Sequence, residues 1–175
     1  MFKKLKSTKD GFTIIEVLIV LAIAALILLI VFLAVPALQR NARNTQRRND
    51  VAGILGGVNE FSSDNNGAQT NKCSGTTTIT WDTVAAGSTT AQTNVGYYNQ
   101  ACAMAAGAQG TVFLDTSKNP IAANTFNAGS FDYVDLQSQM TCSGNASIPG
   151  SARSWAAVYE IENGPGKFAQ QCQAS

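Results

Sequence analysis

The stretch Lys9-Asp10-Gly11-Phe12-Thr13-Ile14-Ile15-Glu16-Val17-Leu18 opens the most apolar part of this 175-residue chain. From Val17 to Leu38, 22 residues carry no formal charge, and nearly all of them are Ile, Leu, Val, Ala or Phe. A run of roughly 20 apolar residues is long enough to cross the hydrocarbon layer of a membrane as a helix. The sequence therefore predicts a membrane-type helix near the N-terminus.

Glu16 places a carboxylate at the start of this apolar run. An ionised carboxylate within a bilayer costs on the order of 2.5–3.5 kcal/mol, so it is expected to have a partner. Its own apolar segment contains no cation. We therefore expect a neighbouring copy of the protein to supply the partner.

A short basic segment precedes the run, and an ordinary secretory signal peptide is one alternative for the whole N-terminus. Val35-Pro36-Ala37 offers small residues at which such a signal could be cut, after Ala37. Signal peptides, however, have an apolar region of only about 7–15 residues. The longer run and its carboxylate favour a helix that is retained.

This N-terminus resembles that of the type IV pilins. The resemblance rests on a basic leader, on Gly11-Phe12-Thr13, on a lone glutamate four residues after Phe12, and on the unbroken apolar helix that follows. It covers roughly the first 65 residues. In that family a membrane peptidase cuts after the glycine, and the exposed phenylalanine is N-methylated. The resemblance implies cleavage after Gly11, methylation of Phe12, and pairing of Glu16 with the Phe12 amine of a neighbouring subunit.

Pro36 lies inside the predicted helix, where it lacks an N–H group and clashes with the preceding turn. We expect it to kink or locally melt the helix. Pilins similar to this chain often carry a proline in this region, where the helix unwinds on filament assembly. Here Pro36 stands about three residues later than in the commonest pattern. Melting in a filament and a simple kink at the membrane surface both remain open.

Beyond Pro36 the pattern becomes amphipathic, which predicts a second helical half from about residue 37 to 63. Five apolar residues recur at helical spacing and form one stripe: Val51, Ile54, Leu55, Val58 and Phe61. Three glycines (Gly53, Gly56 and Gly57) weaken this half by up to about 1 kcal/mol each relative to alanine. Burial of the stripe must compensate. The residues Asp64-Asn65-Asn66-Gly67 are expected to end the helix.

Positive charge flanks the apolar run on both sides, with Lys3, Lys4, Lys6 and Lys9 before it and Arg40, Arg43, Arg47 and Arg48 after it. The positive-inside tendency therefore does not settle the orientation. The leader motif and the position of the cysteines place the C-terminal domain outside. We interpret the arginine cluster as a solvated or headgroup-facing collar. Salt bridges between stacked subunits are the next alternative, and direct DNA contact comes last.

The composition of the chain limits what its C-terminal part does. Charged residues make up only 13% of the chain, and from Val51 onward four Lys and Arg stand against eight Asp and Glu, a net charge of −4. This does not indicate a nucleic-acid-binding surface. No histidine is present, which excludes His-based triads and His metal sites. At 175 residues, one helix and one small domain are expected.

Residues 66–128 are predicted to form a loop-rich connector with short strands, among them 76–81 and 111–115. Residues 130–172 are predicted to form an antiparallel sheet. In it, Phe131-x-Tyr133 begins one strand, Trp155–Ile161 alternates at period two, and Asn163-Gly164-Pro165-Gly166 turns into a last strand that reaches Cys172. The helical stripe is expected to pack on this sheet as one α+β core.

All four cysteines, Cys73, Cys102, Cys142 and Cys172, follow the apolar run. An even count in an extracytoplasmic domain without a C-x-x-C pair favours two disulfides. We expect Cys73–Cys102 and Cys142–Cys172, although the sequence also permits a crossed pattern.

The sequence shows no convincing active site, so we expect no enzyme, no cofactor and no metal. Asp132 and Asp135 should point to opposite faces of a strand. Glu160 and Glu162 share a face but are expected to be solvated. The 53–57 glycines lack the Lys-Ser/Thr of a phosphate loop. Residues 145–147 form a glycosylation sequon, a weak signal. No clustered acidic loop offers the several oxygens that calcium needs.

These inferences divide the chain into a leader (1–11), a transmembrane and polymerisation helix (12–38), its amphipathic half (39–65), a variable connector (66–128), and a sheet region with a C-terminal disulfide (129–175). The expected fold is α+β. The expected function is that of a structural subunit of a type IV pilus, which serves surface attachment, motility or DNA uptake. The expected partners are further copies of the chain, the inner membrane before assembly, the prepilin peptidase and assembly machinery, and a surface or host-cell receptor; direct DNA binding is not expected. A type II secretion pseudopilin and a membrane-anchored binding domain or enzyme are the alternatives.

Overall fold

The computed structural model describes residues 11–70, 72–74, 78–82, 91–94, 100–103, 111–126 and 133–175, with no account of the side chains between 71 and 111. The chain divides into two compact units, Met1–Asn41 and Ala42–Ser175. The helix α1 (Ile14–Asp64) contributes residues to both. The expected leader, except for Gly11, lies outside the described residues.

Ten strands follow α1 in the described part of the chain. They are β1 (Lys72–Ser74), β2 (Thr78–Asp82), β3 (Ala91–Asn94), β4 (Gln100–Ala103), β5 (Thr111–Asp115), β6 (Tyr133–Ser138), β7 (Met140–Ser143), β8 (Ala146–Pro149), β9 (Trp155–Gly164) and β10 (Lys167–Ala174). They form a three-stranded sheet β1-β2-β3, a five-stranded sheet in the order β10-β9-β6-β5-β4, and the hairpin β7-β8.

The end of α1 follows the predicted signal. The helix ends at Asp64, and the chain then turns with positive φ at Asn66 and at Gly67. The N–H of Gly67 donates to the carbonyl of Ser62 across 2.6 Å, and the N–H of Asn65 donates to that of Phe61. These bonds satisfy carbonyls that the last helical turn would otherwise leave unpaired. The C-terminal end of the helix is therefore where the sequence predicted it.

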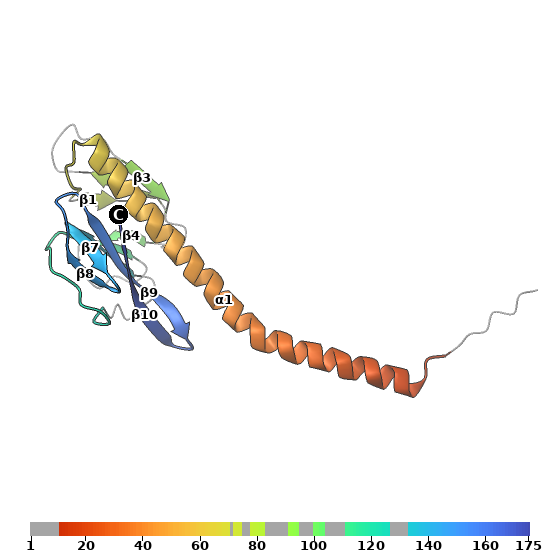
Figure 1. Cartoon of the computed structure of the whole chain (residues 1–175). Coiled ribbons are helices and arrows are strands. Elements are labelled where there is room, and N and C mark those ends of the chain that lie inside the picture. The colour runs from red at the N-terminus through yellow and green to blue at the C-terminus, as the bar shows by residue number, and fades with distance from the viewer. Residues whose placement is uncertain are drawn as a thin grey trace, which may run out of the picture. The chain divides into compact units, whose positions relative to one another are not determined.

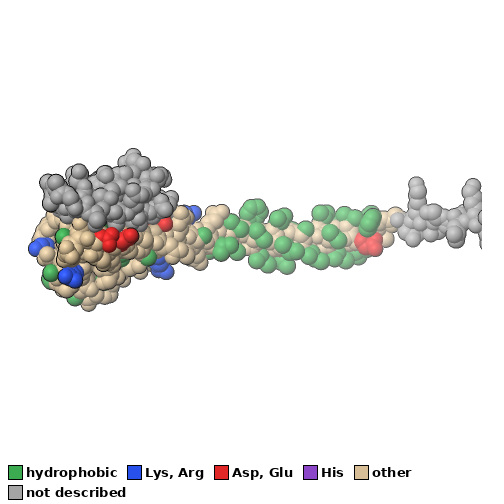
Figure 2. Space-filling view, turned by 90° about the horizontal axis from the view of Figure 1, so that it is seen from above, with side chains coloured by type: hydrophobic (Ala, Val, Ile, Leu, Met, Phe, Trp, Pro, Cys, Tyr) green, Lys and Arg blue, Asp and Glu red, His purple; other side chains and the backbone are tan. Residues whose placement is uncertain are grey.

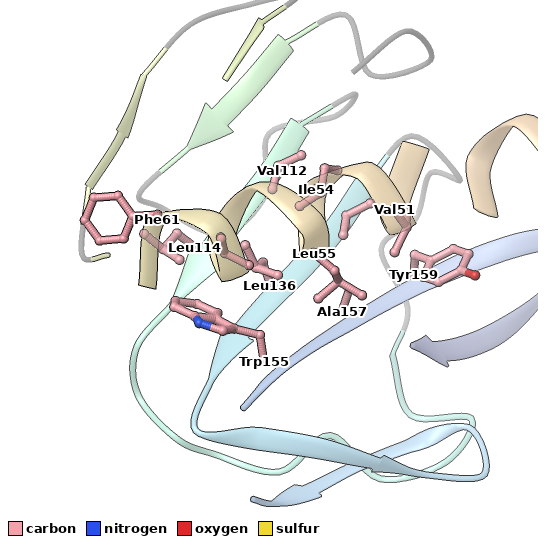
Figure 3. Packing of buried hydrophobic residues seen from close by; sticks show 12 residues of the cluster. Val51, Ile54, Leu55, Phe61, Val112, Leu114, Leu136, Trp155, Ala157 and Tyr159 are labelled. Atoms are coloured by element: carbon pink, nitrogen blue, oxygen red, sulfur yellow. The ribbon is translucent and has the colours of Figure 1, made fainter. Parts of the chain in front are cut away.

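The core lies between the C-terminal part of α1 and one face of the five-stranded sheet (Figure 1). Figure 3 shows the predicted helical stripe against apolar side chains of three strands. The cluster comprises Val51, Ile54, Leu55, Val58 and Phe61 of α1 with Val112, Leu114, Val134, Leu136, Trp155, Ala157 and Tyr159 of the sheet. Burying each large side chain contributes about 1.5–3 kcal/mol. That outweighs the cost of about 1 kcal/mol for each helical glycine.

The predicted antiparallel sheet of residues 130–172 is present, and two connector strands extend it into a mixed sheet. Strands β6, β9 and β10 are antiparallel as expected, but β4 and β5 lie parallel to their neighbours. Both parallel strands come from the predicted connector. Strand β5 has the predicted bounds, and the other predicted connector strand is shifted to Thr78–Asp82. No local pattern indicated that β4 and β5 would pair in parallel with the sheet.

The opposite face of the sheet is also covered, which the period-two prediction for residues 155–161 missed. Six consecutive residues of β9, from Trp155 to Glu160, are buried. The buried side chain of Gln170 on β10 donates to the carbonyls of Ala122 and Asn145 and accepts from the N–H of Phe126. It thereby joins the 116–126 loop and the β7-β8 turn to the sheet. A strand covered on both faces shows no alternation.

The disulfide between Cys142 and Cys172 is present, as predicted. Its Cα atoms are 5.7 Å apart, and it joins β7 to β10. Cys73 and Cys102 lie in β1 and β4, two strands that contact each other. Their side chains lie outside those described, so the Cys73–Cys102 bond stays a prediction.

Candidate functional site

The segment Gly11–Thr13 lies just before α1 in non-helical conformation. All three residues are exposed, and the side chain of Phe12 keeps 89% of its surface accessible. A Cβ added at Gly11 would meet no atom within 4 Å. The bond between Gly11 and Phe12 is thus accessible to a peptidase, and packing within this chain does not require a glycine there.

Thr13 and Glu16 form a capping box at the start of α1. The backbone N–H of Thr13 donates to Oε2 of Glu16 across 2.8 Å, and the Thr13 hydroxyl donates to the same oxygen across 2.7 Å. In return, the N–H of Glu16 lies 3.4 Å from Oγ1 of Thr13. Such a reciprocal arrangement satisfies backbone N–H groups that the first turn leaves without helical partners.

The capping box corrects one sequence-based expectation. We expected Glu16 to find no partner in its own segment, but it accepts two hydrogen bonds from Thr13. The spacing Thr13-x-x-Glu16 before an apolar run was the signal that could have revealed this. Thr13 supplies neutral donors and no positive charge. The carboxylate therefore still lacks a cationic partner among the described residues.

The first half of α1 presents apolar side chains to its surroundings. By length and composition this helix can cross a membrane, and it lies near the N-terminus. The large apolar side chains from Phe12 to Leu38 are exposed, for example Leu18 at 60% and Phe32 at 75%. Figure 2 shows them covering the visible face of this segment. Such a surface requires lipid or protein around it.

A hollow lies beside the capping box. Its walls are Phe12, Glu16, Val17, Val20 and Leu21, and its volume is about 280 Å³. Apart from the carboxylate of Glu16, the lining residues are apolar. The carboxylate and the cleavage-site phenylalanine thus share one concave surface.

Pro36 lies within α1, and the helix is continuous through it. Because proline has no N–H, the carbonyl of Phe32 cannot receive its usual helical hydrogen bond. The predicted melting concerns an assembled filament, so it stays a prediction.

A polar cluster joins α1 to β9 within the unit 42–175. Arg43 forms a fork on Glu162, with Nε donating to Oε1 across 2.8 Å and Nη2 to Oε2 across 2.6 Å. The fully buried Arg47 donates from Nη2 to Oε1 of the same carboxylate across 3.0 Å. The hydrogen bond from Arg43, together with the smaller contribution of Arg47, lowers the pKa of Glu162. Glu162 is therefore a charged residue held by two guanidinium groups.

Asn44 completes this cluster by binding the backbone of β9. Its amide nitrogen donates to the carbonyl of Glu162 across 2.8 Å, and its carbonyl accepts the N–H of Glu162 across 2.9 Å. The same carbonyl oxygen accepts from Nη1 of Arg47. The pairing of β9 with β6 stops at Tyr159. On the side of β9 where β6 no longer pairs, the Asn44 amide thus satisfies the backbone N–H and carbonyl of Glu162.

Two interpretations from the sequence are wrong at this point. Arg43 and Arg47 bind Glu162 instead of forming a solvated collar, and Glu162 is paired instead of solvated. The sequence separation of 115 or more residues left no local signal for these contacts. Arg40 is half-buried and still fits a surface role, whereas the exposed Arg48 forms a side-chain hydrogen bond with Tyr159 of β9.

Of the other candidate acidic residues, the structure describes Asp135 and not Asp132. Asp135 is buried on β6. Burial, with a further contribution from the charge of Asp115, raises the pKa of Asp135 to about 7. Among the described residues, no three His, Cys, Asp or Glu side chains group as metal ligands.

Comparison with known proteins identifies a family motif in the N-terminal part of the chain. Residues 6–32 match the prokaryotic N-terminal methylation motif, which is the type IV pilin and prepilin signature. The match includes Gly11, Phe12, Thr13 and Glu16. It supports a type IV pilin-like or pseudopilin protein, and with the apolar helix it fits a membrane-anchored precursor. No curated protein and no solved structure matches the chain.

Proposed function

We propose that this chain is a structural subunit of a type IV pilus that is stored in the membrane as a precursor and polymerises through its N-terminal helix. The methylation motif at residues 6–32, followed directly by an exposed apolar helix, carries the proposal. The prepilin peptidase cuts after Gly11 and the new N-terminus, Phe12, is methylated. The subunit then leaves the inner membrane for the cell surface through the pilus assembly machinery.

The energetics of polymerisation follow from the composition of α1. Its first half exchanges lipid for the equally apolar surroundings of neighbouring helices, so extraction costs little net hydrophobic free energy. Glu16 is the exception, because it is costly in lipid and has no cationic partner among the described residues. The Phe12 amine of a neighbouring subunit, freed by cleavage, supplies one. The hollow beside Glu16, which is open and otherwise lined by apolar residues, supports this pairing.

The remaining segments take roles that follow from this assembly. Residues 12–38 form the polymerisation helix, with Pro36 as the point where it kinks or melts, and residues 39–65 form its amphipathic half. Residues 66–128 carry the variable surface loop, and residues 129–175 carry the C-terminal disulfide region. The filament serves attachment, twitching motility or DNA uptake through contact with a surface or host-cell receptor.

Substitution of Glu16 tests the pairing. We expect Glu16→Ala and Glu16→Gln to leave precursor levels in the membrane unchanged and to abolish or sharply reduce surface filaments, as counted by electron microscopy and by shearing. Glutamine retains the ability to form a capping box but carries no charge. Its loss of filaments would therefore report the charge and not the cap.

Thr13→Ala is the matched control, because it removes the hydroxyl of the capping box and keeps the carboxylate. Loss of an N-cap costs only about 1 kcal/mol, so filament yield should stay close to that of the unmodified protein. Normal piliation with Glu16→Gln would overturn the pairing. A pseudopilin of a type II secretion system shares the N-terminal motif. Loss of surface filaments from cells that lack this chain would favour the pilus over that alternative.

A further inference from the structure

Two carboxylates on β9 have opposite surroundings although they lie two residues apart. Glu162 receives hydrogen bonds from Arg43 and Arg47. Glu160 keeps only 7% of its surface exposed, yet no described residue donates a hydrogen bond to it or forms an ion pair with it. Its oxygens are not among the fully enclosed unpaired atoms of the described residues, so they meet solvent and not a protein donor. Burial raises the pKa of Glu160.

A cavity of about 280 Å³ lies beside Glu160, on the sheet face opposite α1. It is lined by Asn124, Phe126, Glu160, Phe168 and Gln170. The amide of Gln170 is already engaged, because it donates to two carbonyls and accepts the N–H of Phe126. Glu160 is thus the acidic group of the lining, and no hydrogen-bond donor among the described residues occupies its carboxylate.

Two aromatic rings flank this carboxylate. Phe126, at the end of the 116–126 loop, lines the cavity. Its ring stacks on Tyr133 with centroids 5.5 Å apart, and this contact holds the Phe126 ring in place. Phe168 lies on β10 and is 40% exposed. Ring faces attract cations, and the attraction grows as water is excluded. The cavity therefore combines a negative group with walls that favour positive charge.

We propose that this cavity, here called the Glu160 cavity, binds an organic cation: an alkylammonium group that pairs with Glu160 and lies against Phe126 and Phe168. A hard metal ion fits the lining poorly, because calcium takes six to eight oxygen ligands and only one carboxylate is present. The volume lies near the lower end of ligand pockets, so it suits a single small group. A lysine side chain of a second copy and a free amine share this chemistry.

Titration of the unassembled full-length chain in detergent tests the proposal. The probe is Nα-acetyl-lysine methylamide, and its control is the norleucine analogue, which has the same backbone but no ammonium group. Calorimetry should detect millimolar binding of the lysine probe alone. Equal binding of both compounds, or no binding of the lysine probe at millimolar concentrations, overturns the proposal.

Variants assign the binding to the cavity. Glu160→Gln keeps the shape and should weaken the lysine probe by about tenfold or more, the fold-change expected for one hydrogen bond to a charged group. Phe168→Leu should weaken it by a few fold, up to about thirtyfold. Glu60→Gln, at an exposed carboxylate on α1, should leave binding unchanged. Unchanged binding in Glu160→Gln, with circular dichroism confirming its fold, overturns the proposal.

Cross-linking distinguishes the two sources of the cation. Labelled and unlabelled copies are mixed, concentrated and treated with a carbodiimide, which joins carboxylates to nearby amines. A Glu160–lysine link between differently labelled copies identifies a second copy as the source, whereas probe binding without such a link identifies a free amine. Absence of probe binding overturns the proposal whatever the cross-linking gives. The titration uses no filament, so its failure leaves the proposed function untouched.

Discussion

At the scale of single residues, Glu162 shows how the amphipathic half of α1 is held to the sheet by polar as well as apolar contacts. Arg47 is fully buried, and its guanidinium binds both Glu162 and Asn44. A buried arginine is stable only when carboxylates and carbonyls satisfy it. The cluster therefore fixes the helix to one position along β9, which apolar packing alone specifies less strictly.

Replacement of Arg47 tests this role. Arg47→Met keeps most of the side-chain volume but removes donors to Glu162 and Asn44. We expect the free energy of unfolding to fall by about 1.5–3 kcal/mol, the range for a hydrogen bond to a charged group. The loss should not be larger, because Arg43 still pairs with the carboxylate. The measurement is denaturant unfolding of the full-length chain in detergent, followed by tryptophan fluorescence.

Arg40→Met is the matched control on the same helix, because Arg40 is half-buried and no ion pair joins it to a described residue. Its free energy of unfolding should stay within about 0.5 kcal/mol of that of the unmodified protein, as for most surface substitutions. Equal effects of the two substitutions would contradict the proposed role of Arg47.

The raised pKa of Asp135 predicts that the stability of the fold depends on pH. Burial raises its pKa in the folded chain to about 7, whereas an unperturbed aspartate titrates at 3.8. The folded state therefore keeps a proton that the unfolded state releases as pH rises. Stability from this group is fully present below about pH 4 and decreases up to about pH 7. The total loss reaches at most roughly 4 kcal/mol, at 1.36 kcal/mol for each pKa unit.

The variant Asp135→Asn cannot ionise, so this decrease should disappear. Unfolding measured from pH 4 to 8 should show the variant more stable than the unmodified chain at the upper end of the range. Titrating groups that do not interact with Asp135 are common to both proteins and cancel in the difference, whereas Asp115 and Tyr133 interact with it. Parallel pH profiles for the two would show that Asp135 is not the cause.

At the scale of elements, the C-terminal disulfide joins the β7-β8 hairpin to the last strand. The bond spans 30 residues between Cys142 and Cys172. Closing a loop of this length stabilises the fold by about 3–4 kcal/mol on the chain-entropy account. We expect the double variant Cys142→Ser/Cys172→Ser to lose about that amount in denaturant unfolding. Unchanged stability would mean that the hairpin is held by its other contacts alone.

A helix, turn or strand could be predicted from the sequence where a pattern within a few residues specifies it. The bounds of α1, its terminating Asn66-Gly67 turn and the strand Thr111–Asp115 follow from patterns within a few residues, and the sequence predicted them. The parallel pairing of β4 with β5, and of β5 with β6, depends on which distant strands meet. No local pattern encodes that choice.

The same distinction applies to the candidate site. The cleavage and methylation residues form one continuous motif, so they were found by sequence alone. The capping role of Thr13 was equally local and was overlooked. The contacts of Arg43 and Arg47 with Glu162 join residues far apart in sequence, as does the cavity at Glu160. The sequence predicted the helix and the strand that carry these residues, but not that the folded chain brings the residues into contact.

At the scale of the whole molecule, the chain combines an apolar N-terminal segment with a disulfide-bonded, mildly acidic C-terminal part. Its positive charges concentrate on both sides of the apolar run, while the residues from Val51 onward carry a net charge of −4. The methylation motif and the apolar helix fit a membrane-anchored precursor. In the proposed function, lipid surrounds the apolar segment before assembly and neighbouring subunits surround it afterwards.

The central claim is that a membrane-stored precursor becomes a filament subunit by losing its first eleven residues. Mass spectrometry of the N-terminal peptide from sheared surface material tests it most directly. The account predicts a chain that begins at a methylated Phe12 and that sediments as filaments. Surface material of unassembled monomers that still begin at Met1 would contradict it.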